Sequence, residues 1–392
     1  MELLLISVCS IVIWLLYEKF LKGIKDVFIL SIPIFLLWIY IFMPVTFYFF
    51  FNGFLPGKPD QDLYYEFASN YNINSLTDTV NIAFERNFHN FLYWQIATIA
   101  YNLSFFSPVL SLCLINFVAH LFISIFAYYS IYLILGSKRK AKIGMLFFLF
   151  SPTFISFGLY IIRDILIVLA FAGMFLSLLF IYKRGFSVKY VFLLIIFSFF
   201  AFSLRGQLIL VISLLSFQIF LTRFFRDRSF LFYSILQVVF LIQVYIIIKI
   251  FNLNFAGSGV LVDFLIHLIS WDLLKTILIK FPIYILGIGF LDPQVGKTFS
   301  LQVILLTRLL AIDSLVIPFI FVYFYIKKWR KDVFVNLIIF ALFLYFALYM
   351  YAQNFFEGGY GFHFRAMLPF FYVFYLLVIS EFLKKDKVSM VN

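Results

Sequence analysis

Charged residues are scarce in this chain and make up only 12% of its 392 residues. Hydrophobic residues make up 65%, and a soluble domain cannot bury that much apolar surface. The alternation of apolar and polar positions that marks a transmembrane β-barrel is also missing. Apolar runs of about 18 residues recur instead, and each is long enough to cross a ~30 Å hydrocarbon layer as a helix. The sequence therefore predicts an all-α, polytopic membrane protein.

Cysteine and the common catalytic motifs are equally scarce. The two cysteines, Cys9 and Cys113, lie inside predicted spans, so neither a disulfide framework nor a zinc site is expected. The chain has no Walker A, GxSxG, HExxH or GxGxxG pattern, which argues against ATP-driven pumping by this chain alone. We assign no cofactor and no metal ligands, although carboxylates in the first long loop are of the kind that binds a divalent cation.

Charge clusters and Gly/Pro boundaries divide the apolar runs into eleven predicted spans, within a range of about 9 to 13. These spans are residues 3–18, 27–51, 107–135, 143–162, 165–182, 187–204, 207–222, 229–251, 305–326, 333–352 and 366–383. All soluble parts are loops, so residues 1–392 are expected to form one transmembrane domain. Two of these loops are long, 52–106 and 252–304. The second contains Asp263 and His267 on one helical face, which predicts a helix lying in the membrane interface.

Basic residues gather on one side of the predicted membrane. Six clusters lie there, at 19–25, 138–142, 183–189, 223–228, 327–331 and 384–387. This side carries 20 of the 30 basic residues but 6 of the 18 acidic residues, and we expect it to face the cytoplasm. The N-terminus would then lie outside and the C-terminus inside. The net charge of +12 comes largely from these short clusters between apolar runs, so no nucleic-acid partner is expected.

Arg205 is predicted to lie below the outer membrane boundary. Residues 190–222, between two cytoplasmic clusters, must supply two spans and their connection. Each leg then has about 16 residues, or ~24 Å, which is shorter than the ~30 Å hydrocarbon core. A cation at this depth normally faces a cavity or a partner, and we expect a recessed cavity beneath the Asp60–Glu66 segment. The neighbouring hairpin is longer, so Arg163 and Asp164 are expected near the boundary itself.

The first long loop opens with an acidic and aromatic motif, Asp60-Gln-Asp62-Leu-Tyr64-Tyr65-Glu66. A helix that begins near Asp60 would place Asp62 and Glu66 on one face. Carboxylates at the water–lipid boundary can act as general bases on sugar hydroxyls, so all three acids are candidate catalytic residues. The tyrosine pair is a candidate for substrate binding. The alternative is a solvated helix N-terminus whose acidic residues favour the helix dipole.

Single arginines at the outer ends of apolar runs are candidate substrate-binding residues: Arg163, Arg205, Arg308 and Arg365. Arginine never deprotonates and binds phosphate in a bidentate way, which suits a lipid pyrophosphate entering from the outer leaflet. The alternative is that these arginine side chains snorkel to the membrane interface, or form structural pairs such as Arg163 with Asp164 and Arg308 with Asp313. His363, in the loop before the last span, is a further candidate because histidine can shuttle a proton.

Four motifs follow one another along the chain: Asp60-x-Asp62-x-Tyr64-Tyr65 in a Gly/Pro loop, IRDIL at 162–166, SLR at 203–205, and Arg365 before the last span. This arrangement resembles bacterial polysaccharide polymerases of the Wzy and EpsG-like kind, and in its layout the wider GT-C membrane glycosyltransferases. Asp60 or Asp62 would match the acidic position of the first outer loop, and Arg163 the hairpin arginine. That arginine is usually followed by Gln, whereas Asp164 follows here.

The resemblance implies glycosyl transfer at the outer face of a bacterial inner membrane. The reaction would polymerise undecaprenyl-pyrophosphate-linked repeat units of O-antigen, capsule or exopolysaccharide, with a chain-length regulator as a partner protein. One alternative is a GT-C glycosyltransferase that adds a single sugar from an undecaprenyl-phosphate donor. Another is a lipid-linked glycan transporter or flippase, which would place polar groups near the bilayer midplane.

His120, the histidine inside a predicted span, is interpreted as a packing residue.

Overall fold

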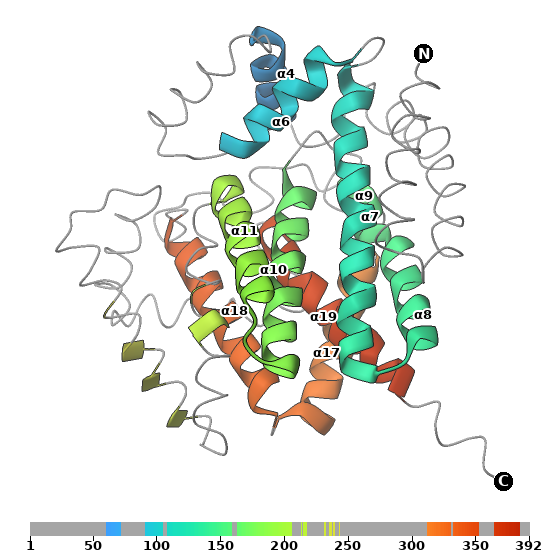
Figure 1. Cartoon of the computed structure of the whole chain (residues 1–392), viewed down its shortest axis with the longest axis vertical. Coiled ribbons are helices and arrows are strands. Elements are labelled where there is room, and N and C mark those ends of the chain that lie inside the picture. Colours follow the sequence, from blue (N-terminus) through green and yellow to red (C-terminus); the bar gives the residue numbers. More distant parts are fainter. Residues whose placement is uncertain are drawn as a thin grey trace.

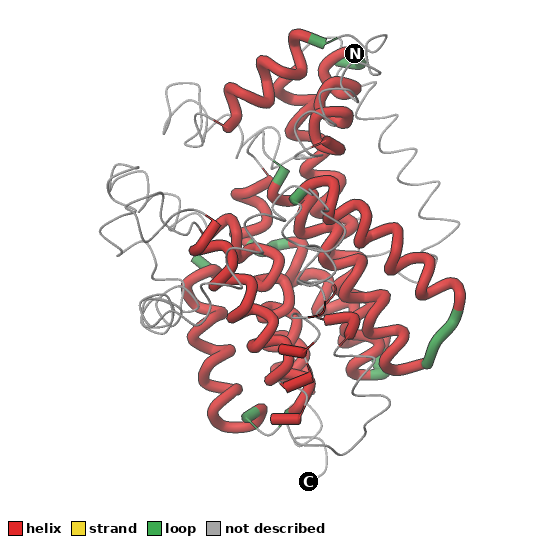
Figure 2. The backbone as a smooth tube through the Cα atoms, turned by 90° about the vertical axis from the view of Figure 1, so that its left-hand side faces the viewer, coloured by secondary structure: helices red, strands yellow, loops and turns green. Residues whose placement is uncertain are grey.

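A computed structural model of the chain describes seven continuous segments and a few single positions between 213 and 243. The segments are residues 60–71, 91–104, 108–158, 163–205, 312–330, 332–352 and 364–384. All regular structure in these segments is helical (Figures 1 and 2), which confirms the predicted all-α class for this part of the chain. The predicted spans 3–18 and 27–51 and the whole 252–304 loop lie outside the described residues.

Most of the described helices coincide with predicted spans, whereas the helices at 60–70 and 91–102 lie in the first predicted long loop. The described helices are α4 (Asp60–Asn70), α6 (Phe91–Asn102), α7 (Pro108–Leu135), α8 (Lys138–Leu149), α9 (Pro152–Gly158), α10 (Asp164–Arg184), α11 (Val188–Leu204), α17 (Asp313–Phe324), the π-helical turn η6 (Tyr325–Trp329), α18 (Val333–Ala352) and α19 (Phe364–Lys384). Within the described part of the chain, α7, α10 and α19 are each long and apolar enough to cross a membrane, and a bent pair, α8 with α9, makes a fourth candidate. The chain is thus a multi-pass helical membrane protein.

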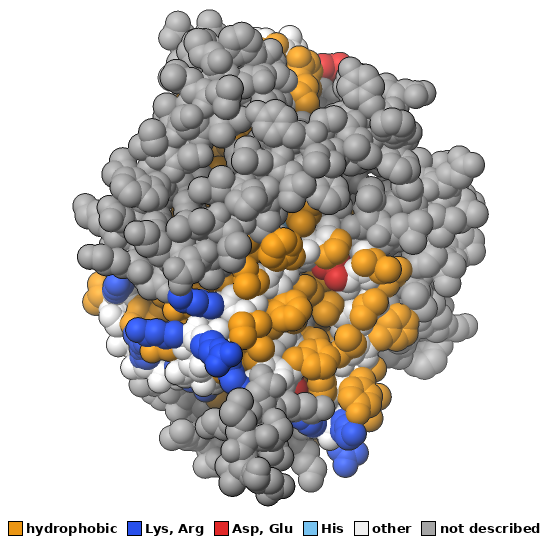
Figure 3. All heavy atoms as spheres, turned by 90° about the vertical axis from the view of Figure 1, so that its right-hand side faces the viewer, with side chains coloured by type: hydrophobic (Ala, Val, Ile, Leu, Met, Phe, Trp, Pro, Cys, Tyr) orange, Lys and Arg blue, Asp and Glu red, His pale blue; other side chains and the backbone are white. Residues whose placement is uncertain are grey.

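Tight turns place the basic clusters at 138–142 and 183–189 at one end of the helix bundle, which we call the basic end. Gly136, at φ +68°, joins α7 to α8, and Gly185, at φ +98°, joins α10 to α11. Both angles lie in the left-handed region that glycine adopts without a Cβ clash. Lys and Arg side chains lie beside and below a broad apolar surface on one face of the molecule (Figure 3).

Helix α10 forms the centre of the bundle and packs against α7, α11 and α19. It is buried along nearly its whole length. At Gly173 the ring of Phe197 from α11 approaches so closely that an added Cβ would lie 2.6 Å from the ring carbon Cδ1. Membrane helices commonly pack closely through small residues, because lipid offers no hydrophobic drive for their association. On the other side, Phe171 packs on Phe370 of α19, with ring centroids 5.4 Å apart.

One predicted span is corrected by the structure. Residues 143–162 were expected to form one continuous helix, but α8 and α9 meet at an angle of 48° around Ser151. Pro152 explains the break, because it has no N–H to donate and it disfavours helical geometry at the residue before it. Proline also fits the first position of a helix, which is its position in α9.

Side chains from other helices satisfy the backbone groups that this break exposes. Tyr375 Oη donates to the carbonyl of Phe147 at 3.0 Å. His120 Nε2 lies 3.0 Å from the carbonyl of Phe148. Backbone groups in a membrane need such partners, because no water is present in the hydrocarbon core to provide them.

A helical pair beyond the far end of α10 and α11 completes the described structure. In both views α4 and α6 lie there, away from the basic end (Figures 1 and 2). Aromatic contacts hold the pair together: Tyr64 meets Tyr93 edge-on at 4.6 Å, and Phe67 stacks on Trp94 at 4.6 Å between ring centroids. The side-chain amide of Asn102 closes the unit by donating to the carbonyl of Tyr71 at 2.9 Å.

Candidate functional site at the distal end

Two helix junctions meet at the end of the bundle opposite the basic end, and we call the residues around Arg163, Asp164 and Arg205 the distal site. Arg163 and Asp164 stand at the start of α10, and Arg205 directly follows α11. Arg163 Nη1 donates a hydrogen bond of 2.8 Å to the carbonyl of Leu204. This bond ties the two arginine-bearing junctions together, although the two residues are 41 positions apart in the sequence.

Arg205 is buried and pairs with a carboxylate. Only 5% of the residue is exposed, and its Nη2 lies 3.2 Å from Asp164 Oδ1. Its Nη1 lies 3.5 Å from the hydroxyl of Tyr345 on α18. The 17 residues of α11 span ~25 Å, close to the short leg of ~24 Å predicted for this hairpin. Arg205 thus has an acidic partner, Asp164, which stands at the start of a neighbouring helix.

The α4–α6 pair packs next to this site. Burial raises the pKa of the Tyr93 hydroxyl well above its usual range, and the nearby Tyr64 and the charge on Asp164 raise it further. The positive charge of Arg163 acts on the same hydroxyl in the opposite direction. Tyr93 of α6 is therefore close enough to both charged residues to link the distal site with Tyr64 of α4.

Helix α4 begins at Asp60, as the acidic motif predicts. Asp60 and Asp62 belong to its first turn, and Glu66 is exposed one turn further on. Tyr65 is half-buried, and its ring centroid lies 5.6 Å from that of Tyr101 on α6. Tyr64 is buried, so in this structure its ring belongs to the core between α4 and α6. The acids are thus carried by a short helix whose aromatic face is fixed against α6.

The remaining predicted site residues are placed only in part. Arg365 is the second residue of α19, whose first half packs against α10 and α18. The ring centroid of Phe370 on that helix lies 5.4 Å from that of Tyr345, whose hydroxyl is near Arg205. The start of α19 therefore lies at the same end of the bundle as the distal site. Arg308 and His363 lie outside the described residues.

Sequence reasoning missed a second polar cluster, which lies at the break between α8 and α9. Asp313, at the start of α17, accepts hydrogen bonds from the hydroxyls of Ser151 and Thr153 and from the backbone N–H of Thr153, the last at 2.9 Å. Ser151 stands ~20 Å along the helix from Lys138, at a rise of ~1.5 Å per residue. The only signal in the sequence was the Ser-Pro-Thr run inside an apolar segment.

No protein-family model, curated protein or solved structure matches this chain. Within the residues that the structure describes, no group of three His, Cys, Asp or Glu side chains is arranged to hold a metal ion. The function therefore has to be inferred from the chemistry of the distal site and from the motifs that carry it.

Proposed function

We propose that this protein is a membrane glycosyltransferase that polymerises undecaprenyl-pyrophosphate-linked oligosaccharide repeat units. The product would be O-antigen, capsule or exopolysaccharide, made at the outer face of a bacterial inner membrane. The distal site would face that side, because the opposite end of the bundle carries the basic clusters. The substrate would lie across the membrane surface at this end of the bundle, with its lipid in the bilayer and its sugars outside.

One observation carries this proposal: two arginines converge with one carboxylate at the distal site. Helix α6 packs on α11 beside it and carries α4, the helix with the acidic residues. Arg205 is neutralised by Asp164, so this pair fixes the geometry of the junction. Arg163 is half-buried and is held at the same junction by its bond to the Leu204 carbonyl. A guanidinium group that is oriented in advance and partly shielded from water is well suited to the two negative charges of a diphosphate.

The proposed reaction forms one glycosidic bond at the expense of one glycosyl phosphate bond. A hydroxyl oxygen of the acceptor sugar attacks the anomeric carbon of the donor glycan, and the bond from that carbon to the diphosphate oxygen breaks. Asp60 or Asp62 takes the hydroxyl proton as general base. Arg163 stabilises the charge that develops on the leaving undecaprenyl diphosphate, and Arg365 adds positive charge from the start of α19.

Replacing the acids tests the proposal in cells. Asp60→Asn and Asp62→Asn remove the general base while keeping the size of the side chain. We expect loss of the long glycan ladder in at least one of the two variants, with a rate reduction of about 10²-fold or more. The measurement is the length distribution of the surface polysaccharide, run beside an immunoblot of the membrane fraction.

Asp332→Asn is the matched control, because it makes the same chemical change at the basic end. Asp332 Oδ1 caps α18 by accepting from the N–H of Val335 at 3.2 Å, and asparagine caps a helix as well as aspartate does. This variant should keep the full ladder. A full ladder in both acid variants would overturn the assignment, and a single added sugar in place of a ladder would point to the single-sugar transferase.

A lipid-linked glycan transporter is the second candidate, and the α8–α9 break favours it. Broken helices and polar groups deep in the bilayer are typical of transporters, and Asp313 and His120 both lie at this break. A transporter moves its substrate without forming a bond. Purified protein that yields longer glycans from a lipid-linked repeat unit would therefore exclude a transport-only role.

A further inference from the structure

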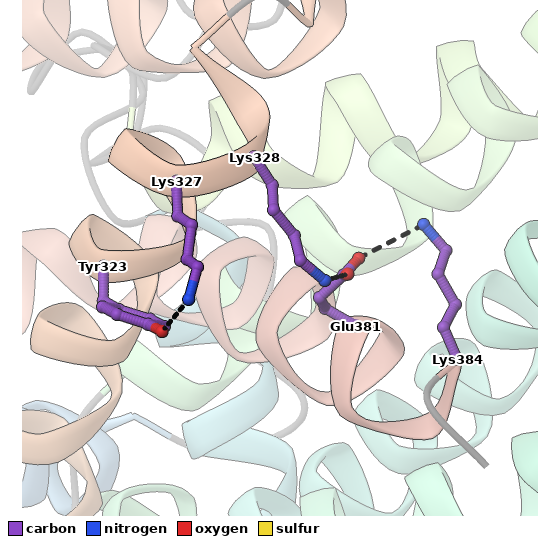
Figure 4. A network of polar contacts seen from close by, with 5 residues as sticks. All are labelled: Tyr323, Lys327, Lys328, Glu381 and Lys384. Carbon is purple, nitrogen blue, oxygen red and sulfur yellow. Dashed lines mark hydrogen bonds and ion pairs between the residues drawn. The ribbon is translucent and has the colours of Figure 1, made fainter. Parts of the chain in front are cut away.

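Three lysine ammonium groups from three different helical segments converge on the last turn of α19. Lys328 of η6 and Lys384 of α19 approach Glu381 from opposite sides and donate to its two carboxylate oxygens (Figure 4), with Lys384 Nζ 3.3 Å from Oε2. Lys140 of α8 donates to the backbone carbonyl of Leu383. We call Lys140, Lys328, Glu381 and Lys384 the basic cluster.

The charges of the basic cluster do not balance. It contains three ammonium groups and a single carboxylate, so it keeps a net positive charge. The Glu381 side chain is only 7% exposed, whereas the side chains of Lys328 and Lys384 are 37% and 55% exposed. The carboxylate is therefore more shielded than the two lysine side chains, which keep exposed surface toward a further anion.

Exposed apolar side chains flank the basic cluster at the same level of the bundle. Phe382 on α19 and Ile326 on η6 are 46% and 64% exposed. Lys327 Nζ donates to the hydroxyl of Tyr323 at 2.9 Å and lies 5.2 Å from the centre of its ring. That hydrogen bond raises the pKa of Lys327, so a fourth positive charge stands beside the cluster at neutral pH. Cations next to exposed aromatic and aliphatic groups are typical of the boundary between headgroups and hydrocarbon.

We propose that the basic cluster binds the phosphate headgroup of an anionic phospholipid in the leaflet at the basic end. The phosphate oxygens would bridge Lys328 and Lys384 above Glu381, and the acyl chains would run along Phe382 and Ile326. A lipid explains the apolar flank, which a free phosphate ion would not use. Basic pockets between helices at the cytoplasmic side are the usual sites for such headgroups. This site is independent of the glycosyl transfer proposed for the distal end.

Lipid-dependent stability of the full chain tests this site. The purified protein in neutral detergent micelles would be titrated with phosphatidylglycerol, or with phosphatidylcholine of the same acyl chains, and its Tm followed by tryptophan fluorescence. Phosphatidylglycerol should raise the Tm of the wild type and phosphatidylcholine should not. Each lysine near the surface should contribute about fivefold in apparent affinity, so the double variant Lys328→Gln/Lys384→Gln should bind about 25-fold more weakly.

Two further variants keep the test decisive. Lys183→Gln/Lys189→Gln removes the same charge from exposed residues at the basic end, outside the cluster, and should keep the response to phosphatidylglycerol. Glu381→Gln removes the competing carboxylate and should strengthen binding, which settles the case even if the double lysine variant does not fold. Equal losses in both lysine pairs, weaker binding in Glu381→Gln, or an equal Tm shift with inorganic phosphate would each overturn the proposal.

Discussion

The buried pair of Arg205 and Asp164 determines what each charged residue of the distal site can contribute. Two charges withdrawn from water are costly, and their mutual attraction offsets that cost only if both are present. Arg205 also reaches Tyr345, so the pair connects α10, α11 and α18. Arg163, which is more exposed, keeps its guanidinium at the edge of the same junction. In the proposed reaction, the buried pair would therefore orient the junction and Arg163 would contact the substrate.

Removing one charge of this pair should be more harmful than removing both. Asp164→Asn leaves Arg205 buried without a counter-charge and should lower the free energy of unfolding by about 3 kcal/mol. The double variant Asp164→Asn/Arg205→Gln should recover most of that loss, because a neutral hydrogen-bonded pair replaces the ions. Thermal unfolding of the purified variants measures both effects. A double variant as unstable as the single one would show that the two residues are not coupled.

At the scale of secondary structure, the α8–α9 break is the feature that departs most from a simple bundle. Pro152 interrupts the helix, and three other helices supply the groups that complete it: His120 from α7, Asp313 from α17 and Tyr375 from α19. The break is thus a junction that holds four segments in register. Its polar groups are enclosed by helices, which is the condition under which irregular backbone persists in a membrane.

Asp313 is expected to stabilise this junction as a hydrogen-bond acceptor. Asp313→Leu leaves the Thr153 N–H and two hydroxyls without their acceptor and should cost about 3 kcal/mol of stability. Asp313→Asn keeps a carbonyl oxygen in the same place and should cost about 1 kcal/mol. Thermal unfolding of the two variants in the same detergent gives the comparison. Equal losses in both would contradict a hydrogen-bonding role for this residue.

The close approach of α10 and α11 gives a second prediction at this scale. Gly173→Ala places a methyl group 2.6 Å from the Phe197 ring and should cost about 1–3 kcal/mol. Gly144→Ala is the matched control, because its nearest neighbour is the flexible end of Ile131, which can turn away. Adding Phe197→Leu to Gly173→Ala should recover part of the loss. If the two alanine variants unfold at the same temperature, the ring contact does not limit helix packing.

Across the whole molecule, apolar run length and charge were enough to locate α7, α10 and α19, since both are local properties of the sequence. The spacing of the basic clusters also predicted a short leg before Arg205, and α11 has 17 residues. The break at Ser151 could not be predicted in the same way. Its stabilising bonds join Asp313 to residues 160 and 162 positions away, and proline alone does not show whether a membrane helix will break. Likewise, nothing in the sequence indicated that Arg205, 41 positions away, pairs with Asp164.

The bundle has one basic end and one end where Arg163 and Arg205 meet at the junction of α10 and α11, and we propose that the two ends face different compartments. The basic end would interact with anionic lipid headgroups. The distal end would receive lipid-linked sugars from the opposite leaflet. Under these proposals, each cluster of charge would have a different partner, and glycosyl transfer would take place on the side opposite the basic end.

Direct assay of bond formation by the purified protein tests the central claim best. The full chain in detergent would be incubated with an undecaprenyl-pyrophosphate-linked repeat unit, and both the glycan length and the released undecaprenyl diphosphate would be measured. We predict a ladder of glycans, with one diphosphate released for each new glycosidic bond, and loss of both products when Asp60 and Asp62 are changed to Asn. Unchanged substrate in the presence of folded wild-type protein, or a ladder that survives both substitutions, would contradict the assignment.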